Sequence, residues 1–168
     1  MAAILRTVEF LALSLWLGSD VFLSFVVAPG AFSVLASRDQ AGAIVGFSLT
    51  RMHIIGVICG VAIMLVRLLR IRTLASFAAP AGLCVLLMIV LTVVSQSAVT
   101  PKMAALRVQM GSIESAIAKQ SAQPTAVENP LLAEFSRLHR ISVMLESGVL
   151  LAGFTAMYLM VRELVSVR

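Results

Sequence analysis

The residues whose types and spacing could support chemistry lie toward the end of the chain, at positions 134–147. There His139, Ser142 and Glu146 recur three and four residues apart, so their side chains share one face of a helix. Apolar residues fill the other faces. An ionisable side chain that faces lipid is costly, so this polar face must look at protein. We therefore expect the other helices to be arranged around it.

Two earlier apolar segments carry ionisable groups of their own. In the first, Glu9, Trp16 and Asp20 follow one helical stripe, which we expect to face inward. In the second, Arg51 and His53 lie close together. Asp20 and Arg51 are the obvious ion pair, which would leave the carboxylate at position 146 to a histidine, a proton or a bound cation.

The expected depths of these groups in the membrane bring them together. At 1.5 Å per residue, Asp20, Arg51, His53 and Glu146 fall in one layer, with Gln96 shallower and His139 near the rim. The predicted site is an intramembrane polar cluster that binds or moves a small cation or polar ligand. Its candidate ligand-binding residues are Asp20, Arg51, His53, Gln96, His139 and Glu146. The alternative is a structural or interaction protein in which the cluster only fixes how the helices pack.

The composition indicates that the elements positioning this cluster are membrane-spanning segments. Of 168 residues, 60% are hydrophobic and only 12% are charged, and the mean hydropathy is +1.04. These values are typical of an integral membrane protein, with the lipid bilayer as its partner. The net charge of +5 does not indicate nucleic-acid binding, because the basic residues are scattered at the ends of apolar runs.

The pattern predicts one all-α transmembrane domain over 1–168, a four-helix bundle with one additional amphipathic surface helix. Pro29 and Gly30 should end the first span, and Pro101 should begin the surface helix. That helix should lie on the membrane or across the mouth of the bundle. The predicted spans are about 4–28, 43–69, 74–99 and 138–160, with the amphipathic helix at 101–119 and a loop at 120–130.

Four spans place both termini on the same side of the membrane. Arg67, Arg70 and Arg72 form a basic cluster between the second and third spans. By the positive-inside rule this cluster is cytoplasmic, so we expect both termini in the cytoplasm of a bacterial-type inner membrane, with the polar cluster toward the outside.

The second span contains a pattern for close helix packing. Gly56 and Gly60 share a face in a G-x-x-x-G arrangement, which lets another helix approach closely. We expect these glycines, with Trp16, to be helix-packing residues, and Gly56 and Gly60 could also join two copies of the chain in a homodimer.

Metal and haem chemistry are further alternatives. His53, His139 and Met144 are the candidate metal ligands, with copper the metal that soft sulfur favours, and a haem would need both imidazoles facing each other. No cofactor at all is the simpler interpretation. The sequence has no G-x-S-x-G, no phosphate-binding glycine loop and no H-E-x-x-H, so we assign no catalytic residue and do not favour an enzyme.

Three stretches carry a resemblance to a known family. They are Leu15-Trp16-Leu17-Gly18 through Pro29 to Phe32, then Val99-Thr100-Pro101 with Leu106-Arg107, and Phe135 through Leu138-His139-Arg140 to Val143. The chain resembles the transmembrane-protein-205-like family, whose bacterial members are small four-span proteins classed as a domain of unknown function. This family is distantly similar to the copper-resistance protein D group and to membrane protoporphyrinogen oxidases. These groups are linked to copper handling and haem chemistry, so the resemblance implies that metal or soft-electrophile handling is worth testing.

The chain departs from that family at two positions. Ser136 stands where an acidic residue is usual, and Glu146 stands where asparagine is usual. The resemblance therefore implies a polar group at position 146, whereas its negative charge is a property of this sequence.

Overall fold

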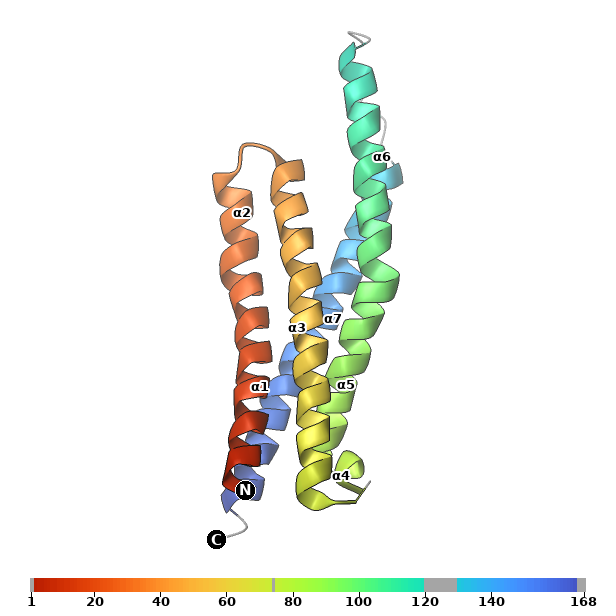
Figure 1. Cartoon of the computed structure of the whole chain (residues 1–168). Coiled ribbons are helices and arrows are strands. Elements are labelled where there is room, and N and C mark those ends of the chain that lie inside the picture. The colour runs from red at the N-terminus through yellow and green to blue at the C-terminus, as the bar shows by residue number, and fades with distance from the viewer. Residues whose placement is uncertain (1, 74, 120–129, 166–168) are drawn as a thin grey trace.

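The computed structural model describes residues 2–73, 75–119 and 130–165, and every regular element in these residues is helical (Figure 1). Four helices are long and apolar enough to cross a membrane: Ala3–Val34, Arg38–Ile71, Pro80–Gly111 and Pro130–Val165. The predicted all-α membrane bundle is confirmed. In order, the elements are α1 (Ala2–Phe22), η1 (Leu23–Val27), α2 (Ala28–Val34), α3 (Arg38–Ile71), α4 (Ala75–Ala78), α5 (Pro80–Val94), η2 (Ser95–Val99), α6 (Thr100–Lys119) and α7 (Pro130–Val165).

The two proline segments do not behave as the sequence predicted. The first helix continues through Pro29 and Gly30 to Val34, and the third continues through Pro101 into α6. A proline ring normally clashes with the carbonyl four residues earlier. For both prolines that carbonyl lies in a π-helical turn, η1 or η2, whose wider backbone accommodates the ring.

Helix α6 is therefore continuous with the third span and does not begin as a separate helix at Pro101. It prolongs the line of α5 and η2 and extends beyond the other helices at the end of the bundle away from α4 (Figure 1). Helix α7 likewise begins at Pro130 rather than near 138, because proline is well suited to the first turn of a helix. The predicted loop at 120–130 lies outside the described residues, apart from Pro130.

Capping defines both ends of α3. The hydroxyl oxygen of Ser37 accepts hydrogen bonds from the backbone N–H groups of Asp39 and Gln40, at 3.2 and 3.4 Å. At the other end Arg72 adopts a left-handed conformation with φ of 57°, and its N–H bonds to the carbonyl of Leu68. These caps fix which turn of α3 holds each residue of the site.

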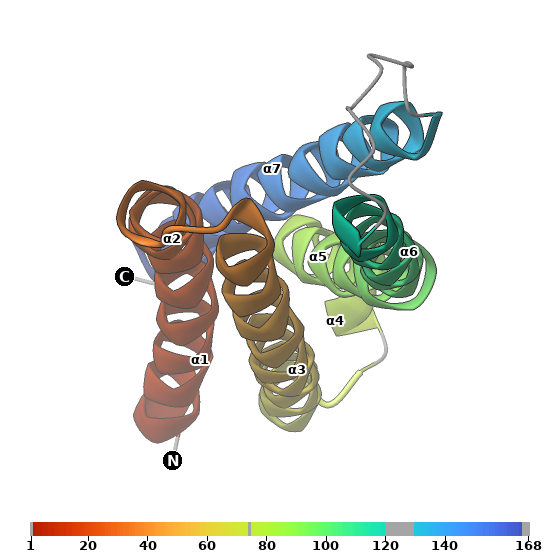
Figure 2. The same cartoon turned by 90° about the horizontal axis from the view of Figure 1, so that it is seen from above.

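The helices form two antiparallel pairs. Helix α1 lies beside α3, and α5 lies beside α7, which crosses the bundle obliquely (Figure 2). Both α1 and α7 have their terminal ends at the same end of the bundle (Figure 1). The apolar core lies in this half of the molecule, around Leu13, Trp16, Ile63, Val85 and Met88. In the other half α2 and α3 diverge from α6 (Figure 1), and a cavity there is lined by residues of α2, α3, α6 and α7.

The glycines of the G-x-x-x-G pattern pack inside a single chain. A Cβ atom at Gly56 would collide with the indole of Trp16, and one at Gly60 would lie 2.6 Å from Ile89 and 2.8 Å from Trp16. Both glycines are buried. The face predicted to pair two copies through Gly56 and Gly60 is thus filled by α1 and α5, and a dimer through it would have to displace Trp16.

Candidate functional site

A hydrogen-bonded cluster joins α3, η2 and α7 in the interior. The ring of His53 is 1% exposed and lies between two partners, with Nδ1 2.8 Å from Oε1 of Gln96 and Nε2 2.8 Å from Oε1 of Glu146. Ser95 donates its hydroxyl to the same carboxylate oxygen at 3.0 Å. Three helical elements that are distant in sequence thus meet at one carboxylate.

The π-helical turn η2 explains how two consecutive residues reach this cluster. In a regular α-helix, Ser95 and Gln96 would point about 100° apart, but here each contacts a member of the His53–Glu146 pair. The backbone N–H of Thr100 bonds to the Ser95 carbonyl five residues earlier, as in a π-helical turn, and the hydroxyl of Thr100 donates to the same carbonyl at 3.0 Å. Such turns occur frequently at functional sites.

Both ring nitrogens of His53 have a hydrogen-bond partner. Opposite an ionised carboxylate, which can only accept, Nε2 is the donor to Glu146. The side chain of Gln96 can offer either its oxygen or its NH₂ group to Nδ1, since these differ only by an amide flip. The ring is therefore held in one orientation with both nitrogens engaged.

Asp20 approaches the cluster from α1. It is fully buried, and its Oδ1 accepts a 3.4 Å hydrogen bond from Ser24. Asp20 interacts electrostatically with both Glu146 and His53. Its second oxygen, Oδ2, has no hydrogen-bond partner, and neither has Nε1 of Trp16 one turn away. The predicted inward stripe on the first helix is present.

Arg51 does not pair with Asp20, and this part of the predicted cluster is wrong. Arg51 is exposed and its guanidinium lies over the ring of Phe47, 5.2 Å from the centroid. The physical reason is helical geometry. Positions 51 and 53 differ by about 200° around the axis, so they cannot both face the interior, and the cluster takes His53.

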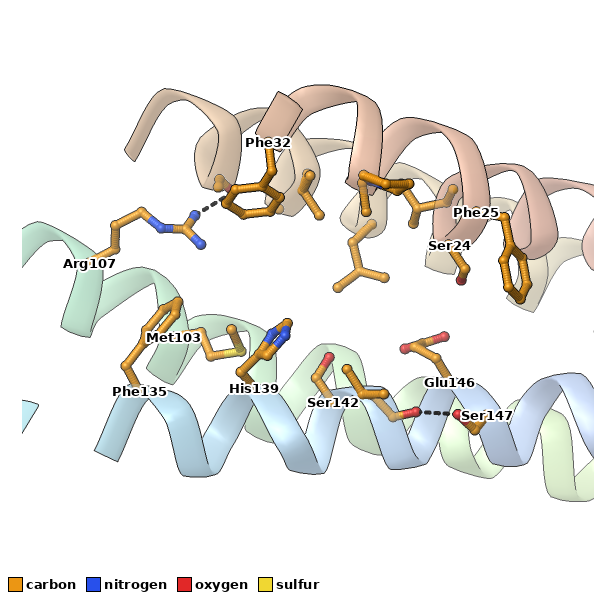
Figure 3. Close-up of a pocket in the computed structure, with 18 of the residues that line it drawn as sticks. Ser24, Phe25, Phe32, Met103, Arg107, Phe135, His139, Ser142, Glu146 and Ser147 are labelled. Carbon is orange, nitrogen blue, oxygen red and sulfur yellow. Dashed lines mark hydrogen bonds between the residues drawn. The ribbon is translucent and has the colours of Figure 1, made fainter. Parts of the chain in front are cut away.

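A cavity of about 540 Å³ opens beside the cluster, between α2, α3, α6 and α7 (Figure 3). His139, Ser142 and Glu146 project into it in a row from α7, opposite Ser24 and Phe25. Most of its wall is apolar and partly aromatic, including Leu23, Phe25, Phe32, Val45, Leu49, Met103 and Phe135. The polar face predicted on the last helix thus faces a cavity that other helices line.

The far end of the cavity contains Arg107, which sequence reasoning placed only on a surface helix. Its Nη1 donates to the carbonyl of Gly42 at 2.6 Å, and the guanidinium lies 5.6 Å from the ring centroid of Phe135. His139 is exposed and lines the same region, some 10 Å along α7 from Glu146. Sequence could not identify Arg107 as a cavity residue, because that depends on α6 continuing straight from the third span.

The candidate metal ligands are not assembled. Met144 is 71% exposed and points away from the bundle, while His53 is buried with both ring nitrogens hydrogen-bonded. Among the residues that the structure describes, no three His, Cys, Asp or Glu side chains form a group that could hold a metal ion. A haem between His53 and His139 would require the first imidazole to leave both of its partners.

A second set of charges lies near the terminal end of the bundle, and its arrangement was not predicted. Arg67 is fully buried on α3 and contacts Glu9 of α1 at 3.5 Å and Glu163 of α7 at 2.9 Å. Arg70 contacts the same two carboxylates at 3.3 and 3.6 Å. This ionic network holds α1, α3 and α7 together. A signal was available, since Glu9 is an ionisable residue within an apolar run.

The fold and the buried polar cluster define a multi-pass helical membrane protein. The chain belongs to the family described as Domain of unknown function (DUF4149), which matches residues 11–112. This match includes two of the stretches on which the sequence resemblance rests, but not the third at 135–143. No curated protein and no solved structure matches the chain.

Proposed function

We propose that this protein binds a small organic cation with an apolar body in the cavity beside Glu146. The observation that carries the proposal is the carboxylate itself. Glu146 projects into the cavity, and its Oε2 atom is buried without a hydrogen-bond partner. A buried acceptor with no partner is costly, and a ligand that donates to it or carries positive charge would remove that cost.

The charges around the site favour a cation. Two carboxylates, Asp20 and Glu146, face a single imidazole, and no lysine or arginine among the described residues forms an ion pair with either carboxylate. Arg67 and Arg70 pair with other acidic residues, and Arg107 bonds a backbone carbonyl. Coulomb attraction is strong where water is scarce, so a cation gains most at this point.

The rest of the wall favours an apolar body on that cation. Phe25, Phe32 and Phe135 contribute aromatic rings, whose faces attract positive charge. A volume of about 540 Å³ lies within the range of sites for drug-sized molecules. A hydrated inorganic ion would leave most of this apolar surface unused.

Tetraphenylphosphonium is a suitable probe, because tetraphenylborate has the same shape and the opposite charge. Binding can be measured by calorimetry on protein in nanodiscs and followed by the fluorescence of Trp16, the single tryptophan. After subtraction of the heat measured with empty nanodiscs, we expect tetraphenylphosphonium to bind the protein and tetraphenylborate not to bind it. Glu146→Gln should weaken the affinity at least about tenfold, which corresponds to about 1.4 kcal/mol.

The matched control is Glu134→Gln, which neutralises an exposed carboxylate on the same helix. It should bind like the unmodified protein. Equal binding of the cation and the anion, or an undiminished affinity in Glu146→Gln, would refute the proposal.

The structural alternative has one specific observation in its favour, the bonds that tie α3, η2 and α7 together through His53. A scaffold alone does not account for the unpartnered oxygens of Asp20 and Glu146. The likeness to the transmembrane-protein-205-like family and the copper-resistance protein D group stays a prediction.

We also infer a bacterial-type inner membrane with both termini in the cytoplasm, which places the cavity mouth outside. This rests on Arg67, Arg70 and Arg72 at the terminal end and on the positive-inside rule. A C-terminal alkaline phosphatase fusion should remain inactive in cells, and an active fusion would reverse the orientation.

A further inference from the structure

Four buried polar atoms without hydrogen-bond partners lie in neighbouring turns around the cluster. They are Nε1 of Trp16, Oδ2 of Asp20, Oγ1 of Thr92 and Oε2 of Glu146. Trp16 and Asp20 are one turn apart on α1, and Thr92 is one turn before Gln96 on α5. Unpartnered buried groups of this kind mark places where water or protons are held.

The charge balance of this region is uneven. Helix α1 contributes the carboxylate of Asp20, α3 the imidazole of His53 and α7 the carboxylate of Glu146, while the facing residues of α5 and η2 are neutral. Farther along the cavity, α7 adds the imidazole of His139 and α6 the guanidinium of Arg107. Even a protonated imidazole at His53 offsets only one of the two negative charges. A remaining charge in the interior of a membrane protein is expensive, and a proton on one carboxylate removes it.

We propose that the empty site holds an exchangeable proton on the Asp20–Glu146 pair, and that a cation binding in the cavity displaces it. The inference rests on the proposed cation site and adds that binding is coupled to proton release. In the step, the O–H bond of the protonated carboxyl group breaks and the proton passes to water. The electron pair stays on the carboxylate, which then faces the cation. One positive charge enters as another leaves.

Ser24 connects the hidden carboxylate to the cavity. Asp20 is fully buried and does not line the cavity, whereas Ser24 lines it and donates to Oδ1 of Asp20. A hydroxyl group can both accept and donate a hydrogen bond, so it can pass a proton between Asp20 and the cavity. This makes Ser24 a positioning residue for the exchange rather than part of the cation site.

The test is calorimetry of tetraphenylphosphonium binding in two buffers of different ionisation enthalpy, with the proton release followed by a dye in weakly buffered solution. We expect close to one proton released per cation bound. In the pH range in which the carboxyl pair is protonated, the Kd of tetraphenylphosphonium should rise about tenfold for each unit by which the pH falls. The reason is that proton and cation compete for the same carboxylates. The scan should run from about pH 5 to about pH 9.

Asp20→Asn should weaken cation binding less than Glu146→Gln does, while proton release falls by at least half and the pH dependence flattens. Glu134→Gln should release protons like the unmodified protein. Binding without proton release and without pH dependence in the unmodified protein would overturn the exchange and leave the cation site standing. Absence of any binding would refute the proposed function itself. The two-buffer comparison needs no variant, so the inference can be tested even if Asp20→Asn fails to fold.

Discussion

His53 is the residue on which three helices depend. Its two ring nitrogens lie 2.8 Å from Gln96 and 2.8 Å from Glu146, and the residue is only 1% exposed. Losing the ring would leave an amide and a carboxylate buried with fewer partners. Each such group costs about 1–3 kcal/mol.

We therefore predict that His53→Ala lowers the free energy of unfolding by about 2 kcal/mol or more. Thermal or denaturant unfolding in detergent measures this change. Arg51→Ala is the control two residues away, and because Arg51 is exposed the change there should stay within about 0.5 kcal/mol. Equal effects of the two substitutions would show that the cluster does not stabilise the fold.

At this scale sequence predicted the members of the cluster better than their pairing. Asp20, His53, Gln96 and Glu146 do come together. Periodicity and depth placed Asp20, His53 and Glu146 in one layer, whereas Gln96 was expected to be shallower. Arg51 does not join them. Charge complementarity suggested its pairing with Asp20, but the angle around the helix, which is fixed by geometry, excludes it.

At the scale of elements, close packing of α1 on α3 depends on a glycine. We predict that Gly56→Ala destabilises the protein by about 1–3 kcal/mol, because the added methyl group meets the indole of Trp16. Gly18→Ala is the matched control, since nothing lies within 4 Å of a Cβ atom there. Thermal unfolding of both variants decides the point, and similar stabilities would mean that α1 and α3 do not rely on this close approach.

The elements that sequence mispredicted are those that contain proline. Pro29 and Pro101 were expected to mark an end and a beginning of helices, which is their usual effect. Here each proline follows a π-helical turn that accommodates its ring. The spacing of apolar side chains in the sequence does not predict such a turn. This error also concealed the cavity, one wall of which is built from α6.

At the scale of the whole molecule, ion pairs between two arginines and two glutamates hold the helices together at the terminal end of the bundle. We predict that Arg67→Met destabilises the protein by about 3 kcal/mol or more, because Glu9 would keep only the Arg70 contact and a buried ion pair would lose its partner. Unfolding in detergent gives the value.

Adding Glu9→Gln to Arg67→Met should restore part of the loss, since Arg70 and Glu163 then remain as a neutral pair. Arg162→Ala, at an exposed position on α7, serves as the control for removing positive charge. A double variant less stable than Arg67→Met alone would contradict this account of the ionic network.

The position of Glu146 within a membrane-spanning helix bears on how the cavity would respond to voltage. A lone cation that moves from solution to this depth crosses part of the transmembrane field, in which a full crossing is worth about 2.3 kcal/mol per 100 mV. Exchange of one cation for one proton moves no net charge through that field. Occupancy of the cavity would then be indifferent to membrane potential and would follow the cation concentration and the pH on the side to which the cavity opens.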